Sequence, residues 1–181
     1  RLRFFHKIRA YFIPKSLELK RFEKRIQYHF LNTYYLEKSL THRSVKNYYE
    51  GNYERLEFLG DAIIDHVVSH WLFKKYIHSD EGTLTKKRAA LVNREFLAML
   101  GHNLKIIDVV QIDSGVNLND EKVADNIAAD VYEAIVGAIY LDGGYKYASN
   151  FIYRTLCLAE HLSEEDANYK GQLIEYCHSQ N

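Results

Sequence analysis

The chain has 181 residues and a formal net charge of zero, and 47% of its residues are hydrophobic and 14% aromatic. That composition is enough to build one domain around a core, which excludes a mainly disordered chain. It contains no run of about 18 uncharged apolar residues and no secretory signal pattern, so we expect a soluble, cytoplasmic protein with no membrane partner. Cys157 and Cys177 form no CxxC or Cys/His pattern, which argues against a structural zinc or a disulfide framework.

The charge is unevenly distributed along the chain. Residues 1–26 hold nine Lys or Arg residues against Glu18 and Glu23, a net charge of +7, so the remaining 155 residues carry −7. A basic segment of this kind often contacts nucleic acid, but it can equally be the solvated face of a helix whose aromatic residues pack inward. The sequence leaves both interpretations open.

The composition predicts a mostly helical protein with few loop breakers, since the chain has a single proline. The fourth predicted helix begins at a cap formed by Thr83 or Thr85 and ends at Gly101. Residues 113–124 are expected to form an exposed loop. The predicted helices, in chain order, span 16–27 with Ser16 as N-cap, 36–44, 54–77, 85–100, 125–141, 148–161 and 169–181.

Two of the predicted helices, 54–77 and 125–141, are apolar nearly all round and should therefore lie at the centre of the fold. Both nevertheless carry acids at spacings of three or four residues, which places the acids of each helix on one face. These acids are Glu54, Glu57 and Asp61 on the first helix and Asp130 and Glu133 on the second. An exposed acidic stripe with local ion pairs, for example to Arg55, is the simpler explanation. Apolar flanking residues argue against it, and buried carboxylates require a compensating cation.

A glycine follows the acids inside each central helix, Gly60 after Glu57 and Gly137 after Glu133. Glycine inside a helix costs about 1 kcal/mol relative to alanine, so it usually has a packing reason such as a close helix crossing. A crossing at these glycines would bring the acids of both helices to one point. Hard oxygen ligands without His or Cys suit Mg²⁺ or Mn²⁺, and such an ion suits hydrolysis of phosphate esters. The residues thus predict a metal-assisted phosphodiester or phosphate-ester hydrolase.

Four blocks of sequence follow one another along the chain: Leu40–Ser44, Asn52–Ala62 (NYERLEFLGDA), Asp80–Thr85 followed by Arg88, Leu91 and Val92, and Ala129–Asp142. Together they resemble the ribonuclease III family of endonucleases specific for double-stranded RNA, and Asn52–Ala62 is similar to its signature. The resemblance covers roughly residues 27–162. It implies an all-helical endonuclease domain that acts as a symmetric homodimer on double-stranded RNA. The implied products, in RNA processing of ribosomal or messenger precursors, have 5′-phosphate and 3′-hydroxyl ends and two-nucleotide 3′ overhangs.

The resemblance also implies roles for the acids. Glu57, Asp130 and Glu133 match the family's Mg²⁺ ligands, where Mn²⁺ can substitute, and Asp61 matches the carboxylate that orients metal-bound water. All four acids are present, whereas some relatives that keep the fold as ribosomal or scaffold proteins have lost them. Cleavage is therefore expected rather than binding alone.

Further positions match the family with less defined roles. Glu54 is expected to support the dimer or the outer shell of the metal, and Glu81 lies at a family position near the active centre, although a helix-start carboxylate explains it equally. His42 and Ser44 are expected to be hydrogen-bonding core residues. The candidates for phosphate contact, with a solvated helix face as the alternative, are Lys86, Lys87 and Arg88.

The expected organisation is a basic N-terminal extension at residues 1–26, an endonuclease domain at 27–162, and a linker at 163–181 that leads into an incomplete double-stranded-RNA-binding domain. Tyr169–Cys177 resembles the first helix of such a domain. A four-helix di-iron or di-manganese protein is a rival, but it requires Glu-x-x-His pairs, and positions 60 and 136 hold Gly and Val.

Overall fold

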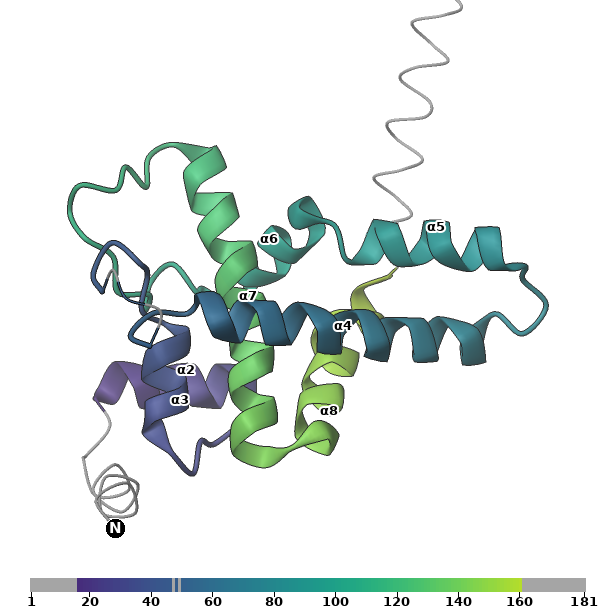
Figure 1. Cartoon of the computed structure of the whole chain (residues 1–181), viewed down its shortest axis with the longest axis horizontal. Helices are drawn as coiled ribbons and strands as arrows, with labels where there is room; N and C mark the ends of the chain where they lie inside the picture. The colour runs from purple at the N-terminus through teal and green to yellow at the C-terminus, as the bar shows by residue number, and fades with distance from the viewer. Residues whose placement is uncertain (1–15, 47, 49, 161–181) are drawn as a thin grey trace, which may run out of the picture.

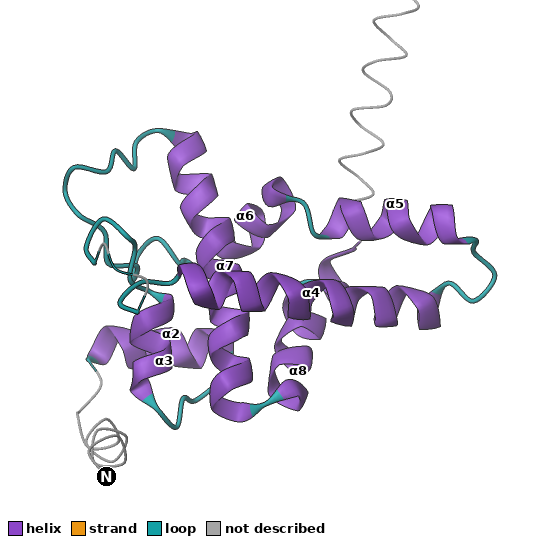
Figure 2. Ribbon diagram, in the orientation of Figure 1, coloured by secondary structure: helices purple, strands orange, loops and turns teal. Residues whose placement is uncertain are grey.

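A computed structural model describes residues 16–46, 48 and 50–160 of the chain, and this part is built of helices and loops (Figures 1 and 2). Within it there is no strand, only an isolated bridge between Thr41 and Gln111. The all-α prediction is confirmed. The helices are α2 (Leu17–Ile26), α3 (Thr33–Ser39), α4 (Glu54–Lys75), α5 (Glu81–Leu91), α6 (Arg94–Asn103), α7 (Glu121–Gly143), α8 (Tyr145–Thr155) and the 3₁₀ turn η1 (Cys157–Ala159).

Helix α7 is the centre of the fold, with α3, α4, α6 and α8 all packed against it (Figure 1). Its sequence is almost entirely apolar or small from Ile127 to Ile139, and nearly all of these residues are buried. A helix buried on all sides can carry polar residues only where they are paired or face an opening. Asp130 and Glu133 are the two acids of this stretch, so their surroundings decide what they can do.

The crossing of α4 over α7 depends on the two glycines singled out in the sequence. A Cβ atom at Gly60 would overlap the carbonyl oxygen of Glu133, and one at Gly137 would overlap the carbonyl oxygen of Leu56. The backbones therefore touch, which only glycine permits at these positions. The predicted close crossing is confirmed, and it fixes the faces of α4 and α7 that carry the acids.

The second half of α4 and all of α5 form a hairpin that extends beyond the other helices (Figure 1). Leu91 is the only buried residue of α5. Polar side chains hold the two arms together: Arg88 Nη1 donates to Ser69 Oγ at 3.0 Å, and Lys87 Nζ lies 4.3 Å from the centre of the Tyr76 ring.

The single helix expected over residues 85–100 is wrong, because the structure has two helices there. Asp80 caps α5 by accepting a hydrogen bond from Thr83 N at 2.8 Å, so neither Thr83 nor Thr85 is the cap. Asn93 then caps α6 by accepting from Phe96 N at 2.8 Å. Its side chain replaces a helical backbone acceptor, which is why the chain breaks at this residue.

Gly101 does not end a helix as expected but lies within α6. A Cβ atom there would come 2.5 Å from the carbonyl oxygen of Ala128 on α7, so this glycine also serves a close helix contact. The sequence distinguishes a terminating glycine from a packing glycine poorly, since both follow an apolar stretch.

The other helix boundaries differ from the predicted ones by a few residues. Ser16 caps α2 as expected, with Leu19 N donating to Ser16 Oγ at 3.2 Å. Helix α3 begins at Thr33, after its cap Asn32, and ends at Ser39 rather than Ser44. The expected loop 113–124 ends earlier, because Asp120 caps α7. The helix expected at 169–181 lies outside the described residues.

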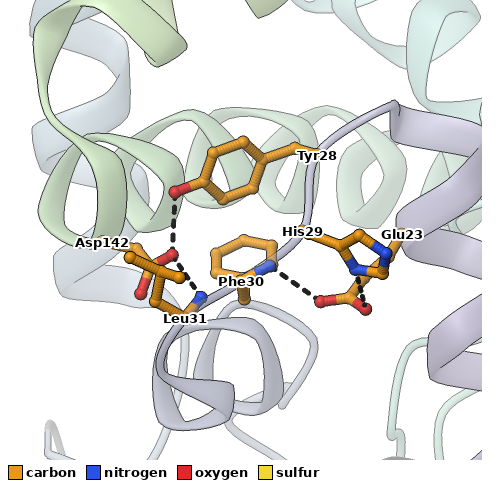
Figure 3. Close-up of polar contacts among 6 residues, drawn as sticks. All are labelled: Glu23, Tyr28, His29, Phe30, Leu31 and Asp142. Atoms are coloured by element: carbon orange, nitrogen blue, oxygen red, sulfur yellow. Dashed lines mark hydrogen bonds and ion pairs between the residues drawn. The ribbon is translucent and has the colours of Figure 1, made fainter.

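Two buried or half-buried acids fasten the segment between α2 and α3 to the rest of the fold (Figure 3). Asp142, near the end of α7, accepts from Tyr28 Oη at 2.7 Å and from the backbone N–H groups of Leu31 and Asn32, each at 2.8 Å. Glu23 of α2 accepts from Phe30 N at 2.8 Å. A charged acceptor for several backbone donors is a strong local restraint.

Helix α2 belongs to the same core as the later helices, because Phe22 and Ile26 are fully buried in it. The packing thus continues across residue 26, where the basic extension was expected to end. No helix in the described part of the chain has the length and apolar character needed to cross a membrane.

Candidate metal centre

Three carboxylates from the two crossing helices meet at one point. Glu57 of α4 and Asp130 and Glu133 of α7 each offer an oxygen, and these oxygens lie within 4.8 Å of one another. Glu57 precedes Gly60 by one turn and Glu133 precedes Gly137 by one turn, so the glycine crossing itself sets the separation of the acids. Elsewhere among the described residues, no other group of three His, Cys, Asp or Glu side chains is similarly arranged.

The acids line an open pocket of about 980 Å³. Asp61, one turn after Glu57 on α4, and Glu54, at the start of α4, also line it. The four acids expected to act together, and Glu54 with them, are thus brought to one pocket. Glu54 is paired at its edge with Arg43, whose Nη1 lies 3.7 Å from Glu54 Oε1.

The environment disfavours full ionisation of the cluster. The pKa of Glu57 is raised to about 7, mainly by burial and next by the charge of Asp130. The pKa of Glu133 is raised to about 8, mainly by burial and then by the charges of Asp61, Glu57 and Asp130. Burial is also the main cause that raises the pKa of Asp61. Half-buried carboxylates that repel one another have a strong affinity for a cation.

The donor set fits a hard divalent ion. Carboxylate oxygens at this spacing, with no thiolate or imidazole in the group, suit Mg²⁺ or Mn²⁺ rather than zinc. The opening of the pocket leaves room for water and a phosphate group beside the acids. A centre of this kind supports metal-assisted attack of water on a phosphodiester.

Glu81 is not brought to this centre within the protomer. It lies in the first turn of α5, where its Oε1 accepts from Thr85 Oγ1 at 2.8 Å. Glu57 is in the first turn of α4 and Glu81 follows the far end of the same helix, about 27 Å away along the axis at 1.5 Å per residue. Lys86, Lys87 and Arg88 are on the same distant hairpin arm, with Lys86 exposed.

Sequence reasoning missed Arg94, the first residue of α6, whose Nη1 lies 2.6 Å from Asp130 Oδ1. Asn93, a good capping residue within the supposed helix 85–100, was the available signal that a new helix starts here. It also missed Asn126 and Tyr53, which line the pocket. His42 and Ser44 do hydrogen-bond, with 2.7 Å between Nδ1 and Oγ, but Ser44 is exposed and His42 lines the pocket rather than the core.

Comparison with known proteins agrees with this geometry. A family model described as Ribonuclease-III-like matches residues 32–159. The ribonuclease 3 of Zunongwangia profunda is 41% identical over 152 residues, covering 80% of this chain and 61% of the relative. The ribonuclease 3 of Bdellovibrio bacteriovorus is 42% identical over 164 residues, covering 86% and 70%. The chain thus spans about two thirds of the length of these curated relatives.

Comparison with solved structures points to the same family. The crystal structure of the nuclease domain of ribonuclease III from Campylobacter jejuni superposes with a TM-score of 0.71 at 37% identity, covering 77% of this chain and 94% of that domain. Giardia Dicer shares the fold, with a TM-score of 0.53 at 20% identity over 83% of this chain and 18% of Dicer. The sequence match, which spans α3 to η1 and includes every acid of the pocket, shows that the chain belongs to the ribonuclease-III-like family.

Proposed function

We propose that the chain is the nuclease part of a metal-dependent endoribonuclease that hydrolyses phosphodiester bonds in double-stranded RNA. The observation that carries the proposal is the meeting of Glu57, Asp130 and Glu133, within 4.8 Å, in an open pocket of a ribonuclease-III-like chain. The acids are the ones that a metal-dependent nuclease needs and that a relative acting only as a scaffold does not.

In this mechanism Glu57, Asp130 and Glu133 hold Mg²⁺, with Mn²⁺ as a substitute. Held by these acids, the ion would supply an activated water and would offset negative charge on the phosphate. Asp61, exposed at the pocket wall one turn from Glu57, accepts a hydrogen bond from the attacking water and orients it. Cleavage leaves a 5′-phosphate and a 3′-hydroxyl. Duplex RNA is recognised by shape, 2′-hydroxyls and phosphates, since its major groove is too narrow for base readout.

The proposal includes a symmetric homodimer. Phe58, adjacent to Glu57, is 81% exposed and lines the mouth of the pocket. Aromatic residues are enriched at protein–protein interfaces, so we place Phe58 in the proposed dimer contact. A solved nuclease domain of the Campylobacter jejuni enzyme is described as flexible in a region involved in dimer formation. Two centres in one dimer would each cut one strand, giving staggered ends with two-nucleotide 3′ overhangs.

The hairpin residues lie away from the acids of their own protomer. Glu81 is too far from its own centre to act there, and its hydrogen bond from Thr85 Oγ1 fits a helix-start carboxylate. Lys86, Lys87 and Arg88 on α5 remain the candidates for phosphate contact. We propose that the nuclease domain includes α2, whose Phe22 and Ile26 lie in the core, as well as the expected range 27–162. The proposal of a linker and the start of an RNA-binding domain at 163–181 is unchanged. The proposal includes a role in processing ribosomal or messenger precursors and a cytoplasmic location.

The test is a cleavage assay with a long perfect RNA duplex, a single strand of the same sequence and a DNA duplex. We expect cleavage of the RNA duplex alone, in Mg²⁺ or Mn²⁺, and none with chelator. The 5′ ends should be labelled by kinase only after phosphatase treatment. Cleavage that persists in chelator, or that favours the single strand, contradicts the proposal, and duplex binding without any cleavage supports a non-catalytic relative instead.

A further inference from the structure

Arg94 reaches into the acidic pocket from a third helix. Asn93 fixes the start of α6, and the next residue, Arg94, directs its guanidinium to α7, with Nη1 2.6 Å from Asp130 Oδ1 and 3.5 Å from Asn126 Oδ1. The side chain is 56% exposed and that of Asp130 is 20% exposed. The ion pair is therefore formed within the candidate metal centre but remains open to solvent on one side.

Arg94 is the arginine of this pocket that pairs with the three-acid group, Glu57, Asp130 and Glu133. Five acids and two arginines line the pocket, and the second arginine, Arg43, is paired with Glu54 at the edge. Arg94 pairs with one of the three grouped acids and lies close enough to the other two, Glu57 and Glu133, for their charges to act on it. It therefore offsets part of the repulsion that the cluster creates.

A divalent ion and the guanidinium compete for the same carboxylate. An ion bound between Glu57, Asp130 and Glu133 would lie within a few ångströms of Arg94, where two positive charges repel strongly in a half-buried site. An exposed arginine on a long side chain can turn away at little energetic cost. Metal binding is therefore expected to break the Arg94–Asp130 pair rather than to coexist with it.

We propose that Arg94 is an internal counter-cation that stabilises the metal-free centre and is displaced by the metal, so that it lowers the affinity of this centre for divalent ions. The inference rests on the proposed metal-dependent function. It assigns Arg94 a regulatory role: the concentration of Mg²⁺ or Mn²⁺ needed to load the centre is set by the strength of this ion pair.

The experiment is isothermal titration calorimetry of Mn²⁺, and separately of Mg²⁺, into the whole chain at pH 7.5. We expect Arg94→Gln to bind Mn²⁺ about tenfold more tightly than the wild type, because the repulsion and the competing pair are both removed. Arg94→Lys keeps the positive charge and should stay near the wild-type affinity. The melting temperature without metal should fall in Arg94→Gln, because the acids lose their counter-charge.

Arg43→Gln is the matched control, since it removes the same charge from the same pocket but from a pair outside the three-acid group. It should change the Mn²⁺ affinity much less. Unchanged or weaker Mn²⁺ binding by Arg94→Gln overturns the inference, because Arg94 would then orient Asp130 for the metal. An equal gain in Arg43→Gln also overturns it, because the effect would then be a general effect of pocket charge.

If the wild type binds metal and Glu133→Gln does not, the proposed function stands whatever Arg94→Gln does. No binding by the wild type overturns both.

Discussion

Glu57 and Glu133 are stabilised as neutral acids by their surroundings in the metal-free protein. Burial raises their pKa values from the ordinary 4.5 to about 7 and about 8. Because the folded state then binds these protons more tightly than the unfolded chain, the stability they contribute is fully present below pH 4.5 and is lost as the pH rises through 7 and 8. We expect the melting temperature in chelator to fall between pH 5 and 8.5 for this reason.

The double variant Glu57→Gln/Glu133→Gln provides the control, since it has no such protons to lose. Its melting temperature should vary less over the same pH range, and saturating Mn²⁺ should flatten the wild-type curve. Parallel curves for the wild type and the double variant in chelator would show that these two acids do not titrate in the folded state as described.

A second prediction concerns the catalytic need for Glu133. Glu133→Gln keeps the shape of the side chain but removes a charged ligand, so we expect duplex cleavage to fall by about a hundredfold or more at a fixed Mg²⁺ concentration. The fold should be retained, because the variant removes a half-buried charge rather than a packed apolar group. Initial rates and circular dichroism check both points. Cleavage within tenfold of the wild-type rate would exclude Glu133 as a metal ligand.

At the scale of whole elements, the crossing of α4 and α7 depends on two glycines. Gly137→Ala places a Cβ atom on the carbonyl of Leu56, and both groups are backbone, so the helices must separate. We expect a loss of about 3 kcal/mol or more in the free energy of unfolding. Denaturant unfolding followed by circular dichroism measures it.

Gly82→Ala is the matched control for the crossing. A Cβ atom at Gly82 meets only Asp80 Oδ1 at 3.8 Å, so alanine should be neutral or stabilising by about 0.5 to 1 kcal/mol in this helical turn. Equal losses in the two variants would mean that the effect comes from changes in the helix backbone and not from the contact between α4 and α7.

The central elements could be predicted from the sequence because their pattern has one physical explanation. Gly60 and Gly137 inside apolar helices, each preceded by acids, require a close crossing, and the structure has it. The break between α5 and α6 could not be obtained from apolar spacing, because the apolar pattern continues across it. Only Asn93 marks the break, because its side-chain oxygen accepts a hydrogen bond from Phe96 N.

Arg94 was missed because the break between α5 and α6 was not predicted. In one continuous helix over residues 85–100, Arg94 is an ordinary polar residue on a solvated face. In the structure it is the first residue of α6, which packs against α7. This packing includes the close contact of Gly101 with Ala128, which has no local sequence signal. The counter-cation of the site was therefore beyond sequence reasoning, whereas the acids were not.

For the molecule as a whole, the assembly proposal predicts the effect of one exposed side chain. Phe58→Glu introduces a charge where an aromatic group is 81% exposed, so it should convert the dimer to a monomer while each chain stays folded. Sedimentation velocity measures the change. Leu17→Glu, at another exposed apolar residue on α2, is the control and should leave the dimer intact. A Phe58→Glu protein that still sediments as a dimer places the interface elsewhere.

We propose that the acids of α4 and α7 form one divalent-metal centre, and the thermal stability of the protein as a function of Mn²⁺ concentration is the sharpest test of this proposal. A ligand that binds only the folded protein stabilises it by about 2.7 kcal/mol at a hundredfold excess over its dissociation constant. We predict that the melting temperature of the wild type and of Glu81→Gln rises with Mn²⁺, while Glu133→Gln and Asp130→Asn respond only weakly. A wild type that Mn²⁺ does not stabilise, or variants at Glu133 and Asp130 that it stabilises as much as the wild type, would contradict a shared metal centre.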